Sequence, residues 1–162
     1  MNIGTERLQP AHLPILEHWI GRAEGRVTPG DFPQKKDDLT EWFDMCTQDP
    51  GRKDYLILAY ETPVGLAGLR KRSEKEKTAE LYLLLGERNY NLLRTATYAV
   101  LPMLDRAFLD LGFDRAVVRV YQNQRWFLTP LEQMGFTQMG EENGLITLSV
   151  EKKEFLQRKY LF

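Results

Sequence analysis

The fold of this chain is decided by the stretch YLLLGERNYNLLRTATYAVL, residues 82–101. It begins with an apolar run typical of a strand, turns through polar residues, and continues with the apolar spacing of a helix. The N-terminus of a helix carries unpaired N–H groups and a partial positive charge, so it attracts phosphates. Turns that bind phosphates at such junctions usually contain glycine, yet residues 91–97 contain none. These residues are therefore either a phosphate site of unusual composition or an ordinary helix cap.

Strands are predicted on both sides of the helix. DYLILAYE (54–61) and GLAGLRKR (65–72) flank a tight turn and predict a hairpin, and TAELYLLLG (78–86) follows a charged turn. The nearly continuous apolar run of the third strand indicates burial on both faces. The helix is expected over residues 93–111, with Pro102 as a kink and Gly112 as its cap. RAVVRVY (115–121) is a further strand, and a strand, helix and strand in this order favour a right-handed parallel crossover.

The remaining segments complete an α+β fold. We expect a first strand at 6–9, helices at 10–24 and 35–49, a short helix at 124–136, final strands within 137–150 and a short terminal helix or tail at 151–160. These elements predict a three-layer α/β arrangement, in which a mixed, mostly antiparallel sheet of six to seven strands is flanked by four to five helices. Parallel neighbours are expected only around the long helix. The 162 residues suit a single domain, residues 1–162.

Composition argues against several function classes. The formal net charge of −1 gives no bulk attraction to nucleic acid or to an anionic membrane. No apolar run approaches the roughly 20 residues of a membrane span. The single cysteine, Cys46, cannot form an internal disulfide, and the N-terminus lacks the apolar core of a signal peptide, so we expect a cytoplasmic protein. His12 and His18 do not share a helix face, so no metal site is expected.

A binding cleft is expected where the strand at 78–86 meets the long helix. If the strands before and after the helix run parallel and then diverge, a ligand can lie between them. Such a ligand would bond to the backbone of Leu83, Leu84 and Leu85 as an added strand does. The N-terminus of the helix would then receive a phosphate at one end of the ligand. This geometry suits an extended ligand that carries a phosphate.

Several motifs together resemble the GNAT superfamily of acyl-CoA-dependent N-acyltransferases. They are YLILAYETPVGLAGLR (55–70), TAELYLLLG (78–86), the turn and long helix, AVVRVYQNQ (116–124) and LEQMGF (131–136). Within the superfamily the chain is most similar to the ribosomal-protein N-terminal acetyltransferase branch, in which a Leu-Glu-Lys-Leu-Gly-Phe segment and an Ala-Glu-Ile motif recur. The resemblance covers residues 55–150 well and the N-terminal helices loosely.

The resemblance implies transfer of an acetyl group from acetyl-CoA to a primary amine, either a peptide N-terminus or a small amine, by direct attack on the thioester. The coenzyme pyrophosphate would lie at the start of the helix, where the family reads Arg/Gln-x-x-Gly-x-Gly/Ala. Ala96 fits this pattern, but Arg94 replaces the central glycine and Asn91 replaces the first residue, so the loop is degenerate. The Arg94 guanidinium would pair with the phosphates instead, and Thr95 and Thr97 would offer hydroxyls.

Two side chains are candidates for catalysis. Glu80 would act as a general base if it faces the cleft. The alternative is an ion pair between Glu80 and an arginine of the neighbouring strand, such as Arg70. Tyr121 would donate a proton to the thioester sulfur, and its alternative is an ordinary tyrosine of the sheet.

Asn123 is the candidate for bonding to the pantetheine amides of the coenzyme. The spacing from Asn123 to Glu132 is one residue longer than in the family, which makes Gln124 a possible replacement. The alternative for Asn123 is a turn residue that bonds to local backbone. The tyrosine that some family members use as a general acid falls at Leu131, so that role is vacant.

The loop RVTPGDFPQ (26–34) would form one wall of the acceptor site, where Glu24 and Asp31 would attract a cationic amine. The partners implied are thus acetyl-CoA and an amine, for a monomer or a homodimer. The alternative function is a catalytically inactive module that keeps this fold and senses acyl-CoA or binds a protein.

Overall fold

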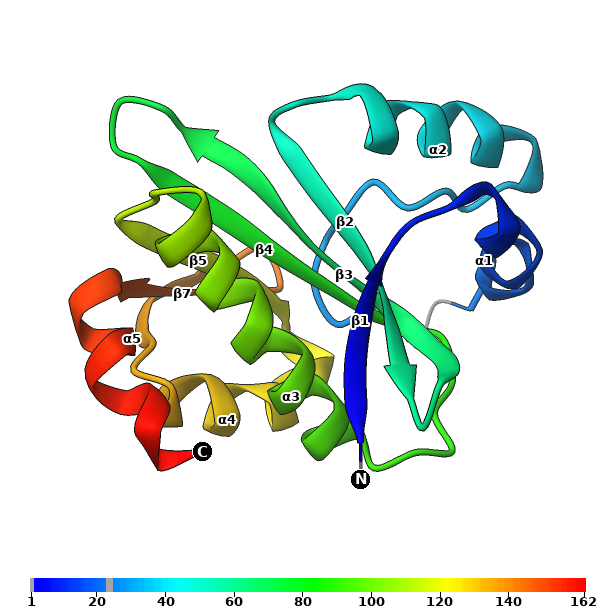
Figure 1. Cartoon of the computed structure of the whole chain (residues 1–162). Helices are drawn as coiled ribbons and strands as arrows, with labels where there is room; N and C mark the ends of the chain where they lie inside the picture. Colours follow the sequence, from blue (N-terminus) through cyan, green and yellow to red (C-terminus); the bar gives the residue numbers. More distant parts are fainter. Residues whose placement is uncertain (1, 23–24) are drawn as a thin grey trace.

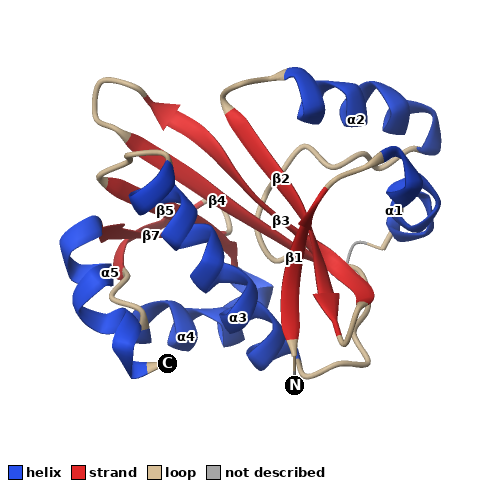
Figure 2. Cartoon of the chain, in the orientation of Figure 1, coloured by secondary structure: helices blue, strands red, loops and turns tan. Residues whose placement is uncertain are grey.

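The computed structural model describes residues 2–22 and 25–162, which form a seven-stranded sheet with helices on both faces (Figure 1, Figure 2). The strands are β1 (Ile3–Arg7), β2 (Arg52–Ala59), β3 (Thr62–Ser73), β4 (Thr78–Leu85), β5 (Arg115–Tyr121), β6 (Thr137–Glu142) and β7 (Leu145–Glu151). The α-helices are α1 (Leu13–Trp19), α2 (Leu39–Gln48), α3 (Leu92–Asp105), α4 (Leu128–Gln133) and α5 (Lys152–Arg158).

The strand order across the sheet is β1-β2-β3-β4-β5-β7-β6. Neighbouring strands are antiparallel, except that β4 and β5, which α3 connects, run parallel. The predicted fold class is confirmed: the sheet is mixed and mostly antiparallel, and its parallel pair lies at the long helix.

The helices form a layer on each face of the sheet. α1 and α2 lie on one side, and α3, α4 and α5 lie on the other (Figure 1). Side chains along β4 alternate between these layers, as the pleat of a strand requires. Leu83 and Leu85 belong to the core under α3, whereas Tyr82 and Leu84 belong to the core under α1 and α2. This two-sided burial explains the continuous apolar run of β4.

The helix α3 changes its period before it ends. Pro102 lies inside it and removes one backbone donor. A π-helical turn, Arg106–Asp110, follows, in which the Leu111 N–H donates to the Arg106 carbonyl at 2.9 Å. Gly112, with a φ of 75°, then turns the chain toward β5, as is common just after a helix.

Two element boundaries differ from the prediction. The first strand is Ile3–Arg7 rather than 6–9, because its extent is set by pairing with β2 and not by a pattern of its own. The helix predicted at 124–136 is divided into a 3-10 helix, Gln122–Phe127, and α4. Residue Gln124 has non-helical backbone angles inside that 3-10 segment, which sets its side chain apart from those of its neighbours.

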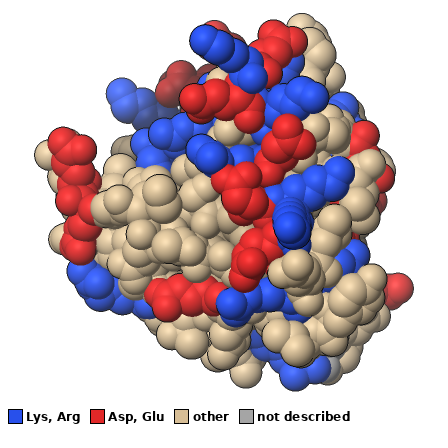
Figure 3. Space-filling view, turned by 90° about the vertical axis from the view of Figure 1, so that its left-hand side faces the viewer, with Lys and Arg blue, Asp and Glu red and all other residues tan. Residues whose placement is uncertain are grey.

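The surface carries charges of both signs. On the face shown in Figure 3, basic and acidic side chains are interspersed around uncharged areas, in keeping with the formal net charge of −1. Among the described helices, none is long and apolar enough to cross a membrane. The described residues also contain no group of three or more His, Cys, Asp or Glu placed to hold a metal ion.

Candidate functional site

The strands β4 and β5 are paired only along part of their length. Parallel pairing extends from Thr78 opposite Arg115 to Leu81 opposite Val118. Beyond these residues β4 continues to Leu85 and β5 to Tyr121 without pairing to each other. The two strands therefore diverge at their C-terminal ends, on the side where α3 begins. This is the divergence that the sequence predicted.

A short segment from the loop after α1 spans the gap between the diverging strands. Arg26 forms an antiparallel bridge with Leu84 of β4. The backbone N–H of Leu83 donates to the Thr28 hydroxyl oxygen at 3.0 Å, and the Tyr121 N–H on β5 donates to the Val27 carbonyl at 3.2 Å. Residues 26–28 thus connect the ends of β4 and β5. They occupy the open edge of Leu83 and Leu84, which the sequence analysis assigned to a ligand, so that expectation was wrong for these two backbone positions.

The bridging segment, residues 26–28, and the preceding Gly25 pack closely against β4. The side chain of Val27 is fully buried in the core under α3, and Thr28 is only 5% exposed. A Cβ placed on Gly25 would lie 2.1 Å from the Leu85 carbonyl oxygen, so only glycine permits so close an approach of two backbones. Sequence reasoning placed residues 26–34 as a wall of the acceptor site, but it did not identify the contacts of residues 25–28 with β4 and β5.

The N-terminus of α3 is the predicted phosphate site. The Asn91 side chain caps it, because its Oδ1 accepts from the Arg94 N–H at 3.0 Å. Thr95 and Ala96 are buried, and the Thr97 hydroxyl donates to the Leu93 carbonyl at 2.8 Å. The Arg94 side chain is exposed and lies over the Tyr98 ring, 5.3 Å from its centroid.

Arg94 is therefore the group at this helix tip that is best placed to meet a phosphate. Thr95 is buried, and the Thr97 hydroxyl bonds to the helix backbone. Asn91 has the role of an ordinary cap, which was the alternative interpretation of this turn.

Gln124 rather than Asn123 points into the protein at the end of β5. Its side chain is buried, with Nε2 donating to the Arg26 carbonyl at 3.4 Å and Oε1 accepting from the Trp126 indole N–H at 2.7 Å. Asn123 is exposed. Gln124 supports the bridging segment from the β5 side, and its proposed replacement of Asn123 at the coenzyme stays a prediction.

Glu80 lies in the paired part of β4 and is held by two arginines. Arg72 donates to one carboxylate oxygen at 2.7 Å, and Arg119 donates to the other at 2.6 and 3.1 Å. The alternative expectation of an ion pair thus describes its contacts, but the suggested partner was wrong. Arg70 is opposite Glu80 in the β3–β4 register, yet its guanidinium bonds to Asp31. The role of Glu80 as a base stays a prediction.

Tyr121 lies at the diverging end of β5, close to Arg26. Burial lowers the pKa of the Arg26 guanidinium, and the nearby Tyr121 phenol partly offsets this effect. Arg26 also donates to the Pro33 carbonyl at 3.0 Å and lies over the Phe32 ring.

The carboxylate of Asp31 is hydrogen-bonded to three side chains of the protein. Arg52, Arg70 and the Trp42 indole all donate to its carboxylate. Burial would raise the pKa of Asp31, but the hydrogen bonds and charges of these partners outweigh it and hold the pKa below its ordinary value. Glu24, the other predicted attractor of an amine, lies outside the described residues.

The structure brings some of the predicted site residues together and separates others. Leu83, Leu84 and Tyr121 meet around residues 26–28, and α3 begins a short turn after β4 ends. Glu80 is opposite Val117, four residues before Tyr121, which is about 13 Å along a strand. The two predicted catalytic side chains are therefore not neighbours.

A mixed sheet whose two parallel strands diverge beside the helix that connects them defines a class of protein, the acyl-CoA-dependent N-acyltransferases. Solved structures share this fold. The spermidine N-acetyltransferase of Vibrio cholerae, as a single-residue variant, superposes with a TM-score of 0.78 at 16% identity, covering 97% of this chain and 98% of that one. The same enzyme in complex with CoA and spermine gives 0.76 at 15% identity, covering 95% and 98%. A chimera of it with hSSAT gives 0.80 at 15% identity, covering 98% and 100%.

The chain belongs to the acetyltransferase (GNAT) domain family, which matches residues 5–137. It is accordingly an N-acyltransferase that uses acetyl-CoA as its cosubstrate. No curated protein sequence matches the chain.

Proposed function

We propose that this protein transfers the acetyl group of acetyl-CoA to an acceptor that carries one primary amino group. The acceptor that fits the site best is the α-amino group of a peptide. The observation that carries the proposal is the divergence of β4 and β5 after Leu81 and Val118, next to the N-terminus of α3. This arrangement offers a helix terminus for the phosphates of an acyl carrier, next to the strand ends that residues 26–28 connect.

The coenzyme would lie along the C-terminal end of β4. We place its phosphates at the start of α3, where the exposed Arg94 guanidinium can pair with them. Its pantetheine arm would pass Leu85 and then follow the bridging segment, residues 26–28, which already occupies the edge of Leu83 and Leu84. Thr95, Ala96 and Thr97 would shape the helix tip from within, and Asn123 would lie at the exposed end of β5.

The reaction in this site is a direct attack. The amine nitrogen forms a bond to the thioester carbonyl carbon, the carbon–sulfur bond breaks, and the coenzyme thiolate takes a proton. Tyr121 is our candidate for the donor of that proton, because it lies at the diverging strand end beside the Arg26 cation. Glu80 is bonded through both oxygens to arginines, so a water molecule is the simpler acceptor for the amine proton.

The charge distribution favours an acceptor with one amino group over a polyamine. A polyamine carries several positive charges and is best received by carboxylates that are not already paired. Glu80 in the paired part of β4, Glu87 just after β4, and Asp31 are each bonded to arginine. Arg26 adds a further positive charge at the bridging segment. A peptide N-terminus, the acceptor of the branch that the sequence resembles, fits this environment.

The test is release of free thiol from acetyl-CoA with a panel of acceptors. A short peptide with a free α-amino group should be turned over faster than spermidine, and the same peptide with a blocked N-terminus should be inert. Faster turnover of spermidine would refute the proposed acceptor. Binding of acetyl-CoA is tested separately by a thermal shift, because a ligand that binds the folded chain raises its unfolding midpoint.

A further inference from the structure

A pocket with a cavity volume of about 210 Å³ lies at the other end of the sheet from the diverging strands. It is formed by the start of β2, the end of β3 and the segment that follows α3, and its lining includes Gly51, Lys53, Leu69, Lys71, Leu111 and Phe113. Lys71 is opposite Ala79 of β4, which is six residues, or about 20 Å along a strand, from Leu85. The pocket is thus separate from the acyl-transfer site.

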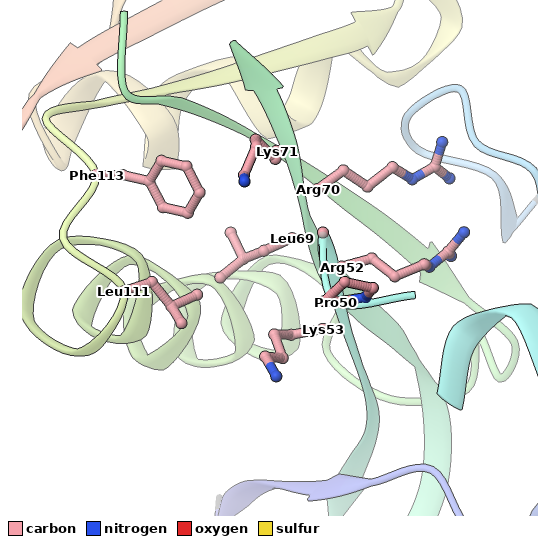
Figure 4. Close-up of a pocket in the computed structure, with 9 residues that line it drawn as sticks. Pro50, Arg52, Lys53, Leu69, Arg70, Lys71, Leu111 and Phe113 are labelled. Carbon is pink, nitrogen blue, oxygen red and sulfur yellow. The ribbon is translucent and has the colours of Figure 1, made fainter. Parts of the chain in front are cut away.

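The pocket joins an apolar surface to two positive charges. Lys53 is opposite Leu69 in the β2–β3 register, and Lys71 follows two residues later, so all three side chains lie on one face of the sheet. Figure 4 shows both lysine side chains on the side of Leu111 and Phe113, with Leu69 between them.

The other cations at the pocket are turned away from it. Arg52 and Arg70 extend in the opposite direction (Figure 4) and bond to Asp31 on the other face of the sheet. Of the described lining residues, none is acidic. Lys71 has one carboxylate nearby, that of Glu74 at 3.7 Å, but Glu74 is 87% exposed and is a weak competitor.

The apolar wall of the pocket depends on the unusual end of α3. The π-helical turn Arg106–Asp110 and the positive φ of Gly112 direct the chain so that Leu111 and Phe113 lie over the sheet. Leu111 is 42% exposed, so its apolar side chain is open to solvent beside two lysines. The π-helical turn at the end of the helix thus places the apolar side chains that form this wall.

We propose that this pocket binds a small apolar monocarboxylate. The carboxylate lies between the ammonium groups of Lys53 and Lys71, and the hydrocarbon or aromatic body lies against Leu69, Leu111 and Phe113. The cavity volume corresponds to about seven molecules of liquid water. This size suits an aromatic acid with a single ring. The apolar wall disfavours a bare phosphate, because phosphate gains nothing from contact with hydrocarbon.

The proposal is tested with benzoate as the probe, in an amide chemical-shift titration of the full chain. Benzoate should shift the amides of Gly51, Leu69, Lys71 and Phe113 with saturation, at a dissociation constant on the order of 1 mM. Benzyl alcohol keeps the ring but lacks the carboxylate, and inorganic phosphate keeps a negative charge but lacks the ring. Both should give much weaker shifts than benzoate. No saturable shift with benzoate, or equal shifts with either control ligand, would overturn the proposal.

Two pairs of variants locate the site. Lys53→Met combined with Lys71→Met should weaken benzoate binding about tenfold, whereas Lys35→Met, on the other face, should leave it unchanged. Leu111→Asp removes the wall and adds a like charge, so it should abolish binding. Leu109→Asp is its control, because Leu109 is also exposed, at 54% against 42% for Leu111, but does not line the pocket. Equal binding in Leu111→Asp and Leu109→Asp would overturn the proposal. The outcome is independent of acyl transfer, since benzoate binding is read without acetyl-CoA.

Discussion

Replacing Thr28 by valine tests whether the bridging segment, residues 26–28, holds β4 at its diverging end. Valine has nearly the same shape as threonine but cannot accept a hydrogen bond. Thr28→Val would therefore leave the backbone N–H of Leu83 without its partner at 3.0 Å, in a place where Thr28 is 5% exposed and Leu83 1% exposed.

The expected cost follows from this burial. A buried donor left without an acceptor costs about 1–3 kcal/mol. Every 1.4 kcal/mol is a factor of ten in an equilibrium constant, so local opening at Leu83 should become about 5 to 150 times more populated. For a chain of this length, each kcal/mol lowers the unfolding midpoint by about 2–4 °C.

Native-state hydrogen exchange is the decisive assay, because it reports the Leu83 amide itself. Thr28→Ser is the matched control: it keeps the acceptor oxygen and loses only a methyl group. We expect faster exchange at Leu83 in Thr28→Val than in Thr28→Ser. If the two variants exchange at the same rate and Thr28→Val is as stable as the parent, the bond between Thr28 and β4 does not support the site as we describe it.

Four further perturbations test other parts of the site. Arg94→Glu should weaken coenzyme A binding by about one to two orders of magnitude, through lost pairing and repulsion with the phosphates; calorimetry that finds no change in a folded variant would contradict this placement. Glu80→Gln should lower the midpoint of thermal unfolding, since it breaks two ion pairs, while the shape of the pH–rate profile persists; loss of one limb of that profile would make Glu80 the base. The pKa of Asp31 lies below its ordinary value of 3.8, so its stabilising contribution is present above that pH and lost as the pH falls through the lowered pKa; thermal unfolding of Asp31→Asn should show less loss of stability in acid than the parent. Gly25→Ala should destabilise the chain by about 1–3 kcal/mol in urea unfolding, because its Cβ would meet a backbone oxygen at 2.1 Å, whereas a Cβ at Gly4, the control, meets nothing within 4 Å.

The sheet could be predicted from the sequence because its strands carry their own patterns. The β2–β3 hairpin consists of two apolar runs joined by a turn. The continuous apolar residues of β4 indicate that it is buried on both faces. The helix between β4 and β5 then fixes the parallel pair. Each of these inferences depends on neighbours in the sequence, and for that reason they needed no knowledge of distant contacts.

The details of the site depend on contacts that no local pattern records. Thr28 bonds to Leu83, which is 55 residues away, and a single bridge has no periodicity to detect. Arg70 was the natural partner for Glu80, being opposite it in the register, but the distant Asp31 takes its guanidinium. In contrast, the one-residue excess before Glu132 was visible in the sequence and drew attention to Gln124, which is buried against Arg26. Its contact with the coenzyme stays a prediction.

The partial pairing of β4 also has a consequence for how the chain is made on the ribosome. Residues 3–85 contain β1 to β4, whereas β5 is not complete until Tyr121, 36 residues later. At roughly 5–20 residues per second, synthesis leaves one edge of β4 without its neighbour for about 2–7 s, and an apolar open edge invites aggregation. The segment at residues 26–28 emerges before β4 and can cover Leu83 and Leu84 at once. We therefore expect it to protect the growing chain before it serves the finished enzyme.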